Sequence, residues 1–191
     1  DRLAVYHHTY GRLDESYHYF HEALQLFNDA ISIKLQAMVH LGIARLCLER
    51  DLLAEANEHC VYALGMLKRD EYGALKGSIL LTAGDISRQR NFAQEALAYY
   101  DQAAHLLLSL GAPEVWAAYL NLALTAYDHE DWESAAQMIS NSRDVALKVT
   151  THEVVSMINS CSLFGLAKRR EWSDFDMILT TLLNSDDHRY A

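Results

Sequence analysis

Residues that interrupt helices are scarce in this sequence. Among its 191 residues there is one proline, Pro113, and there are eight glycines. Proline and glycine are the residues that most often mark turns and break regular structure. So small a number in so long a chain predicts helices that are joined by short turns.

Cysteines, basic clusters and long apolar runs are also scarce, and each shortage excludes a class of protein. Three cysteines, Cys47, Cys60 and Cys161, do not make a disulfide framework, which favours a reducing, cytoplasmic setting. No apolar run reaches the roughly 18 residues that span a membrane, and no secretory signal is present. With 16 basic and 26 acidic residues the net charge is −10, so we expect neither nucleic acid nor membrane as a partner. We attribute the acidity to solubility rather than to a preference for basic partners.

Signatures of catalysis and metal binding are missing as well. The sequence contains no glycine-rich phosphate loop, no nucleophile elbow and no HExxH pair. Ten histidines are present, and His18 and His21 have the i, i+3 spacing at which two imidazoles can share a zinc ion, with His7 and His8 upstream. Because no complete ligand set accompanies them, we interpret them as a polar, partly exposed helix face. The sequence predicts no enzyme, no cofactor and no metal.

A stripe of small and aromatic residues is the main feature that is present. Ala96, Tyr100 and Ala103 occupy positions i, i+4 and i+7, which form one face of a helix. Equivalent triplets begin at residues 16, 56, 135 and 175, so neighbouring copies are 39 or 40 residues apart. These triplets are Ser16, Phe20 and Ala23; Ala56, Cys60 and Ala63; Ala135, Ile139 and Ser142; and Phe175, Leu179 and Leu182. Five copies in register indicate a structural repeat.

A second pattern precedes the stripe by about twelve residues. It places the small residues Ala44, Gly84 and Ala123 where two helices must touch. Each unit is therefore predicted to be a helix, a tight turn, a second helix and a longer turn. The predicted units are residues 1–30, 31–70, 71–110, 111–149 and 150–184, with a tail over 185–191. The predicted helices are 1–9, 14–28, 31–49, 53–68, 71–89, 93–109, 114–128, 132–147, 152–168 and 172–184.

The two patterns together resemble the tetratricopeptide repeat (TPR), up to about residue 184. Leu122, Ala123, Trp132, Ala135 and Ile139 match its skeleton in one unit. The period of about 40 exceeds the usual 34 or so, and the closing proline is absent. Long-period repeats of this kind resemble those of maltose-regulator-type activators, Rap and PlcR-like regulators and spindle-orientation adaptors. HEAT and armadillo repeats have a similar period but lack the stripe.

The resemblance implies an all-α, right-handed superhelical solenoid of about 4.5–5 repeats. It also implies that Cys47 and Cys60 pack together in the core as free thiols. The first helix of each hairpin is expected to line a concave, partner-binding face. Carried over to this sequence, that face comprises Leu41, Arg45, Leu48, Glu49, Leu81, Asp85, Arg88, Gln89, Leu120, Asn121, Leu124, Tyr127, Asp128, Ser160, Phe164 and Lys168.

The composition of this face suits an amphipathic helix or an extended peptide, because apolar residues alternate with charges of both signs. The alternative interpretation is that several of the leucines are core residues and that Arg45 and Glu49 form an i, i+4 pair. A clamp for a terminal carboxylate is not expected, because Asp85 stands where a neutral or basic residue is needed.

Three functions follow as hypotheses. The first is a protein- or peptide-binding domain, with an interaction or sensory role in a larger regulatory or signalling protein. The second is a homo-oligomerisation module, which would give a homodimer through the apolar residues of the last predicted helix. These are Trp172, Phe175, Ile178 and Leu182. The third is a sensor of a small molecule or signalling peptide within a transcription regulator. Because the sequence starts in register without a methionine, we expect further repeats or another domain upstream.

Overall fold

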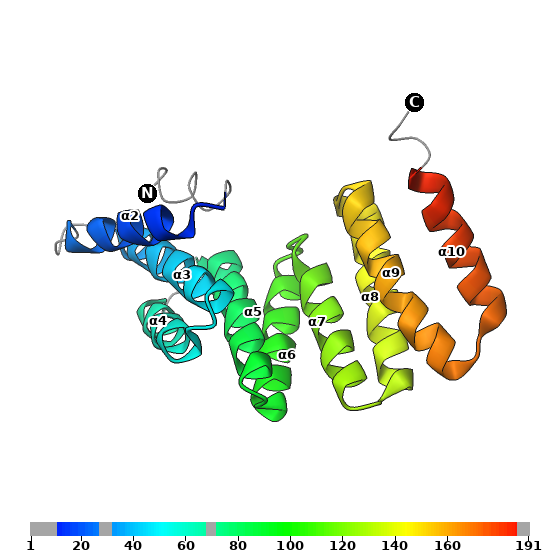
Figure 1. Cartoon of the computed structure of the whole chain (residues 1–191). Coiled ribbons are helices and arrows are strands. Elements are labelled where there is room, and N and C mark those ends of the chain that lie inside the picture. Colours follow the sequence, from blue (N-terminus) through cyan, green and yellow to red (C-terminus); the bar gives the residue numbers. More distant parts are fainter. Residues whose placement is uncertain (1–10, 27–31, 68–71, 187–191) are drawn as a thin grey trace. The chain divides into compact units, whose positions relative to one another are not determined.

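The structure is a computed structural model that describes residues 11–26, 32–67 and 72–186, and every regular element in these ranges is helical (Figure 1). The predicted all-α class is thereby confirmed. The first predicted helix, residues 1–9, lies outside the described residues, as do His7 and His8. The helices are α2 (Leu13–Gln25), α3 (Ile33–Glu49), α4 (Leu53–Met66), α5 (Gly73–Gln89), α6 (Ala93–Ser109), α7 (Val115–Asp128), α8 (Trp132–Val149), α9 (His152–Arg169) and α10 (Trp172–Asp186).

Most helix bounds lie within two residues of those predicted from the sequence. The exception is α2, which ends at Gln25 rather than at residue 28. At the other end, α10 continues to Asp186, so the first two residues of the predicted tail are helical.

Contacts within the chain divide it into two compact units, Asp1–Leu106 and Leu107–Ala191, and each is described by itself. In the first unit α3 packs against α2 and α4, and α5 packs against α3 and α4. In the second unit α7 packs against α8, α8 against α9, and α9 against α10. Packing between successive helices is the arrangement that repeat proteins use to build a core.

The same turn follows α3, α5, α7 and α9. One residue in each turn is left-handed, with φ between 58° and 61°, and these residues are Asp51, Asn91, Glu130 and Arg170. In the first turn the amide of Leu52 donates to the carbonyl of Cys47 across 2.8 Å, the hydrogen bond of a Schellman motif. The repeat is therefore present in the backbone, at intervals of 39 or 40 residues, as well as in the side chains.

Glu130→Gly is expected to stabilise the protein by about 0.5–1 kcal/mol. A left-handed conformation costs a residue with a Cβ roughly 1–2 kcal/mol, and glycine avoids that cost while losing some backbone entropy on folding. Urea denaturation measures the difference. Asn91→Gly is the matched control and should change little, because asparagine tolerates this conformation. Equal effects at both positions would contradict the explanation.

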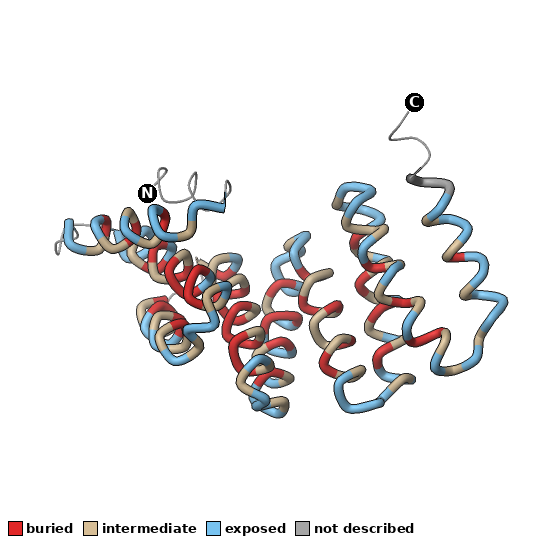
Figure 2. The backbone as a smooth tube through the Cα atoms, viewed as in Figure 1, coloured by how far each residue is buried: buried red, intermediate tan, exposed pale blue. Residues whose placement is uncertain are grey.

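The repeated stripe forms the cores of both units, as the buried segments in Figure 2 show. Four of the five triplets are buried along their whole length, from Ser16 to Ser142. The fifth triplet differs, because Phe175, Leu179 and Leu182 are only half-buried, and Ile178 is the buried residue among positions 172–183 of α10. The reason is that α10 packs against α9 on one side, which buries a single row of its side chains.

A glycine on one helix leaves space that an aromatic ring of a neighbouring helix fills. A Cβ placed on Gly84 of α5 would lie 2.4 Å from the ring of Tyr100 on α6, and one on Gly42 of α3 would lie 2.4 Å from the ring of Phe20 on α2. The hydroxyl of Tyr100 donates to Asp85 across 2.7 Å. Burial raises the pKa of Tyr100, and the nearby Asp85 carboxylate raises it further. This tyrosine therefore links α6 to α5 by packing and by a hydrogen bond.

Burial shifts the pKa values of Cys47, Cys60 and His40 in the first unit. Cys47 and Cys60 are buried and free, and burial raises the pKa of each thiol to about 12, so neither is a reactive thiolate. His40 is half-buried, and burial followed by the neighbouring His59 and His21 rings lowers its pKa to about 4.

Among the described residues, no helix is long and apolar enough to cross a bilayer.

Candidate functional site

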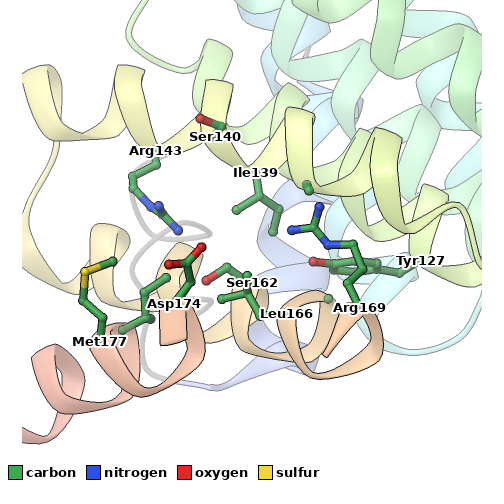
Figure 3. Close-up of a pocket in the computed structure, with 12 residues that line it drawn as sticks. Tyr127, Ile139, Ser140, Arg143, Ser162, Leu166, Arg169, Asp174 and Met177 are labelled. Carbon is green, nitrogen blue, oxygen red and sulfur yellow. The ribbon is translucent and has the colours of Figure 1, made fainter. Parts of the chain in front are cut away.

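A pocket of about 190 Å³ lies in the second unit, between α8, α9 and α10 (Figure 3). Each helix contributes one face. From α8 come Ile139 and Arg143 at i and i+4, and from α10 come Asp174 and Met177 at i and i+3. Residues with these spacings share a helix face, so both helices direct a polar and an apolar side chain toward the same space. The remaining labelled lining residues are Tyr127, Ser140, Ser162, Leu166 and Arg169.

The floor of the pocket is apolar. Ile139, Leu166 and Ile178 all line it, and all three are buried in the free protein. An apolar floor with a few converging polar groups is the usual composition of a ligand site.

Two arginines supply the hydrogen-bond donors of the pocket. The Nε atoms of Arg143 and Arg169 are both buried, and neither has a hydrogen-bond partner within the described parts of the chain. The terminal nitrogen Nη2 of Arg169 is engaged, because it bonds to Glu171 across 2.8 Å. A buried polar atom without a partner costs free energy, so both Nε groups would gain from an incoming acceptor.

Asp174 supplies an acceptor on the opposite side. Figure 3 shows its carboxylate and the Arg143 guanidinium directed toward one another from α10 and α8. Within the described ranges, the Asp174 carboxylate and the Arg143 guanidinium do not form an ion pair. The pocket therefore offers both donors and an acceptor to a ligand.

Tyr127 forms the end of the pocket nearest α7. Its hydroxyl donates to the Cys161 carbonyl across 3.3 Å, and its ring fills the space beside Gly165, where a Cβ would lie 2.4 Å from the hydroxyl oxygen. Burial raises the pKa of Tyr127, although the Arg169 charge acts in the opposite direction. The ring is thus held in place by α9, which makes it a rigid wall.

Beside Tyr127 lies a cluster of aromatic rings. The ring centroids of Tyr127, Trp132 and Phe164 are 5.5–5.8 Å apart, within the range of favourable aromatic pairs. The Lys168 ammonium lies 5.5 Å from the centroids of both Trp132 and Phe164. Phe164 nevertheless remains 51% exposed, which leaves an aromatic face available to a partner.

The structure separates the residues predicted for the concave face into three groups. Leu41 and Leu120 are buried and belong to the two cores, which agrees with the alternative interpretation of these leucines as core residues. The half-buried group comprises Leu48, Leu81, Asp85, Arg88, Asn121, Leu124 and Tyr127. The exposed group comprises Arg45, Glu49, Gln89, Asp128, Ser160, Phe164 and Lys168.

The structure also shows which predicted residues meet. In the first unit, Arg45 of α3 donates to Thr82 of α5 across 3.4 Å. Burial raises the pKa of Asp85, while the Tyr100 hydrogen bond and the charges of Arg88 and Arg45 lower it. In the second unit Tyr127, Phe164 and Lys168 come together as described above.

Of the residues that line the pocket, the sequence analysis named only Tyr127, on α7, for the concave face. A signal was present in α8, where Arg143 follows the buried Ser142 directly and so lies at the edge of the core stripe. A basic residue at such a border is held close to an apolar surface. The Ser162 hydroxyl, which lines the pocket, donates to the Asn159 carbonyl across 2.6 Å. The donors, the acceptor and the apolar floor of the pocket are suited to binding.

No protein-family model matches the sequence, and no curated protein matches it. Solved structures do match. BtubC from P. vanneervenii has a TM-score of 0.83 at 16% identity, over 99% of this chain and 79% of that one. A Rap protein complexed with competence and sporulation factor has a TM-score of 0.79 at 12% identity, over 95% of this chain and 51% of that one. This chain thus spans about half the length of the Rap protein.

A third match is a set of nearly identical TPR-like repeats of the kinesin light chain type from Podosopora anserina. It has a TM-score of 0.77 at 12% identity and covers 98% of this chain and 94% of that one. Identities this low establish a shared fold. The predicted tetratricopeptide-like helical repeat is confirmed as the fold of this chain.

Proposed function

We propose that this chain, a helical repeat with the tetratricopeptide fold, is a protein- or peptide-binding scaffold whose second unit anchors an extended peptide. The observation that carries the proposal is the pair of buried, unpartnered Nε groups of Arg143 and Arg169 above an apolar floor. A peptide main chain offers carbonyl acceptors to the two arginines and N–H donors to Asp174. Its side chain can fill the space beside Ile139 and Leu166.

The size of the pocket favours one residue of a peptide over a whole small molecule. Its volume of about 190 Å³ is below the range of roughly 300–1,000 Å³ that is typical of sites for drug-sized ligands. A longer peptide would continue over the exposed faces of Phe164 and Lys168. This extension lengthens the contact beyond the pocket and adds an aromatic surface.

Local charges decide the recognition here more than the net charge does. The chain carries a net charge of −10, which by itself favours basic partners. Exposed charges more than about 8 Å apart are largely screened at physiological ionic strength, whereas the pocket arginines contact the ligand directly. The peptide therefore need not be basic.

The proposed setting is a larger regulatory or signalling protein in the cytoplasm, in which this chain is the interaction or sensory domain. A Rap conjugation gene regulator of the same fold, solved in complex with the Phr* peptide, supports this role. A role of this kind needs no catalytic group in the pocket.

A peptide array followed by titration of the best binder tests the proposal. Arg143→Ala and Arg169→Ala should each weaken binding by about tenfold or more, because a truncated anchor arginine costs about 2 kcal/mol. Arg143→Lys should be nearly as weak as the alanine variant, since lysine lacks the planar fork of donors. Fluorescence anisotropy gives the dissociation constants.

Lys148→Ala is the matched control, because it removes one positive charge from the exposed end of α8. It should bind the peptide as tightly as the parent. An array without any binder, or a binder that ignores both arginine variants, would contradict the proposed site.

A second candidate function is self-association through α10. Trp172 is 55% exposed and Met177 and Leu183 are each 62% exposed, so one helix presents three large apolar side chains. Exposed apolar surfaces of this kind often mark interfaces. Light scattering should then show a dimer for the parent and a monomer for Trp172→Glu. A monomeric parent at high concentration would remove this candidate.

A further inference from the structure

Two histidines and a glutamate meet in the first unit, far from the pocket residues in sequence. They are His21 of α2 and Glu55 and His59 of α4, and their ligand atoms all lie within 4.8 Å of one another. Glu55 and His59 are one helical turn apart, so they share a face of α4. The three side chains are half-buried, which leaves room for an ion to enter.

His21 carries an unsatisfied atom. Its Nε2 is buried and has no hydrogen-bond partner in the ranges that the structure describes. Buried polar atoms are nearly always paired, so an orphaned nitrogen on an imidazole that lies near a carboxylate and a second imidazole requires an explanation. A cation shared by the three side chains provides one.

Each ligand of the α4 face is held by a further residue. The Tyr17 hydroxyl donates to Oε1 of Glu55 across 2.6 Å, which leaves Oε2 as the oxygen available to an ion. The Nδ1 atoms of His40 and His59 are 2.7 Å apart, so one donates its N–H to the other, which leaves Nε2 of His59 available. The Tyr17 ring also packs on the His21 ring, with centroids 4.3 Å apart. Such partners, which fix the tautomer and orientation of ligands, are a regular feature of metal sites.

The distances and donor types select the class of ion. Zinc binds nitrogen and carboxylate oxygen at about 2.0–2.2 Å, so ligand atoms around it lie about 3.3–3.6 Å apart. Side-chain rotations that move the ligand atoms by about 1 Å would bring the three ligands to that separation. Calcium and magnesium prefer sites made only of oxygen, whereas imidazole suits zinc, copper, iron and nickel.

We propose that His21, Glu55 and His59 bind a divalent transition-metal ion, with zinc as the probe, and that Tyr17 and His40 are positioning residues. The three ligands leave one tetrahedral position for water. Because the ligands come from α2 and α4, the ion joins two helices of the first unit. This site is independent of the peptide pocket, since the two share no residue.

The spacing of the histidines in the sequence does not predict this cluster. His18 and His21 are three residues apart, but His18 pairs with Glu22 across 3.4 Å and is not in the cluster. The true companions of His21 lie more than 30 positions away in the sequence. The proposed site therefore revises the expectation that no metal is bound.

The experiment uses the whole chain without a histidine tag, stripped of metal with a chelator and dialysed. Isothermal titration with Zn²⁺ should show that one ion binds and that its binding requires this cluster. The thermal midpoint should rise when zinc is added. Glu55→Gln and His59→Gln should each weaken binding by at least about tenfold. Both replacements keep a side chain of similar length, so the metal-free variants should still fold.

Tyr17→Phe tests the positioning role. It removes only a hydroxyl and should weaken zinc binding by about 10- to 100-fold while the melting temperature of the metal-free protein changes little. His18→Gln on the same helix is the control, and its zinc affinity should equal that of the parent. The proposal would be overturned if the parent bound no zinc at about 100 micromolar protein. It would also be overturned if zinc binding survived Glu55→Gln and His59→Gln unchanged.

Discussion

Tyr100→Ala is expected to lower the free energy of unfolding by about 3–5 kcal/mol. Tyr100 is fully buried, and it is the largest side chain with so little exposure among the described residues. Removing a large buried aromatic side chain loses its transfer free energy and leaves a cavity, and together these costs fall in that range. The loss is a large fraction of the total stability of an ordinary domain.

Urea denaturation followed by circular dichroism measures this change. Tyr62→Ala is the matched control, because Tyr62 is 58% exposed and its removal should stay within about 0.5 kcal/mol. Tyr100→Phe separates packing from hydrogen bonding. It keeps the ring and removes the hydroxyl that bonds to Asp85, so it should cost about 1 kcal/mol. A Tyr100→Ala variant as stable as the parent would mean that α6 does not pack on α5 as described.

Gly84→Ala is expected to destabilise the protein by about 1–3 kcal/mol, although alanine is the better helix former. The new Cβ would lie 2.4–2.9 Å from three atoms of the Tyr100 ring, which is buried and has no space into which it can move. Overpacking of this kind outweighs the 0.5–1 kcal/mol that alanine normally gains over glycine inside a helix.

Gly65→Ala provides a control of opposite sign. No atom lies within 4 Å of a Cβ at Gly65 of α4, so this variant should be more stable than the parent by about 0.4–1 kcal/mol. The double variant Gly84→Ala/Tyr100→Ala adds a stricter test. Once the ring is gone, the three atoms nearest to the new methyl group are gone too, so the two costs should not add. Additive losses would show that Gly84 and Tyr100 do not contact each other.

The recurring stripe and its turns made the fold predictable. Ala96, Tyr100 and Ala103 lie on one helix face through local geometry alone, and the copies at 39 or 40 residues then fix where each hairpin begins. Helix bounds followed to within two residues in most cases, because polar turn residues interrupt the periodicity at the same place in each unit. The error at the end of α2 arose because Leu26 carries the apolar pattern one residue beyond the last helical position.

Contact residues were less predictable than helices, because exposure depends on neighbours. Leu41 and Leu81 occupy equivalent positions in the sequence pattern, yet Leu41 is 6% exposed and Leu81 remains half-buried. The sequence could name the first helix of each hairpin as a binding surface. It could not state which side of that helix its neighbours would cover.

By itself the sequence determined the all-helical class, the repeat, the positions of the helices and the small residues at their contacts, since all of these follow from spacings of a few residues along one chain. Only the tertiary structure decided which polar groups meet. Arg143, Arg169 and Asp174 converge because three helices pack in succession, and His21 approaches Glu55 and His59 because α2 and α4 both belong to the first unit. Convergence of this kind depends on helix packing, which no local pattern records.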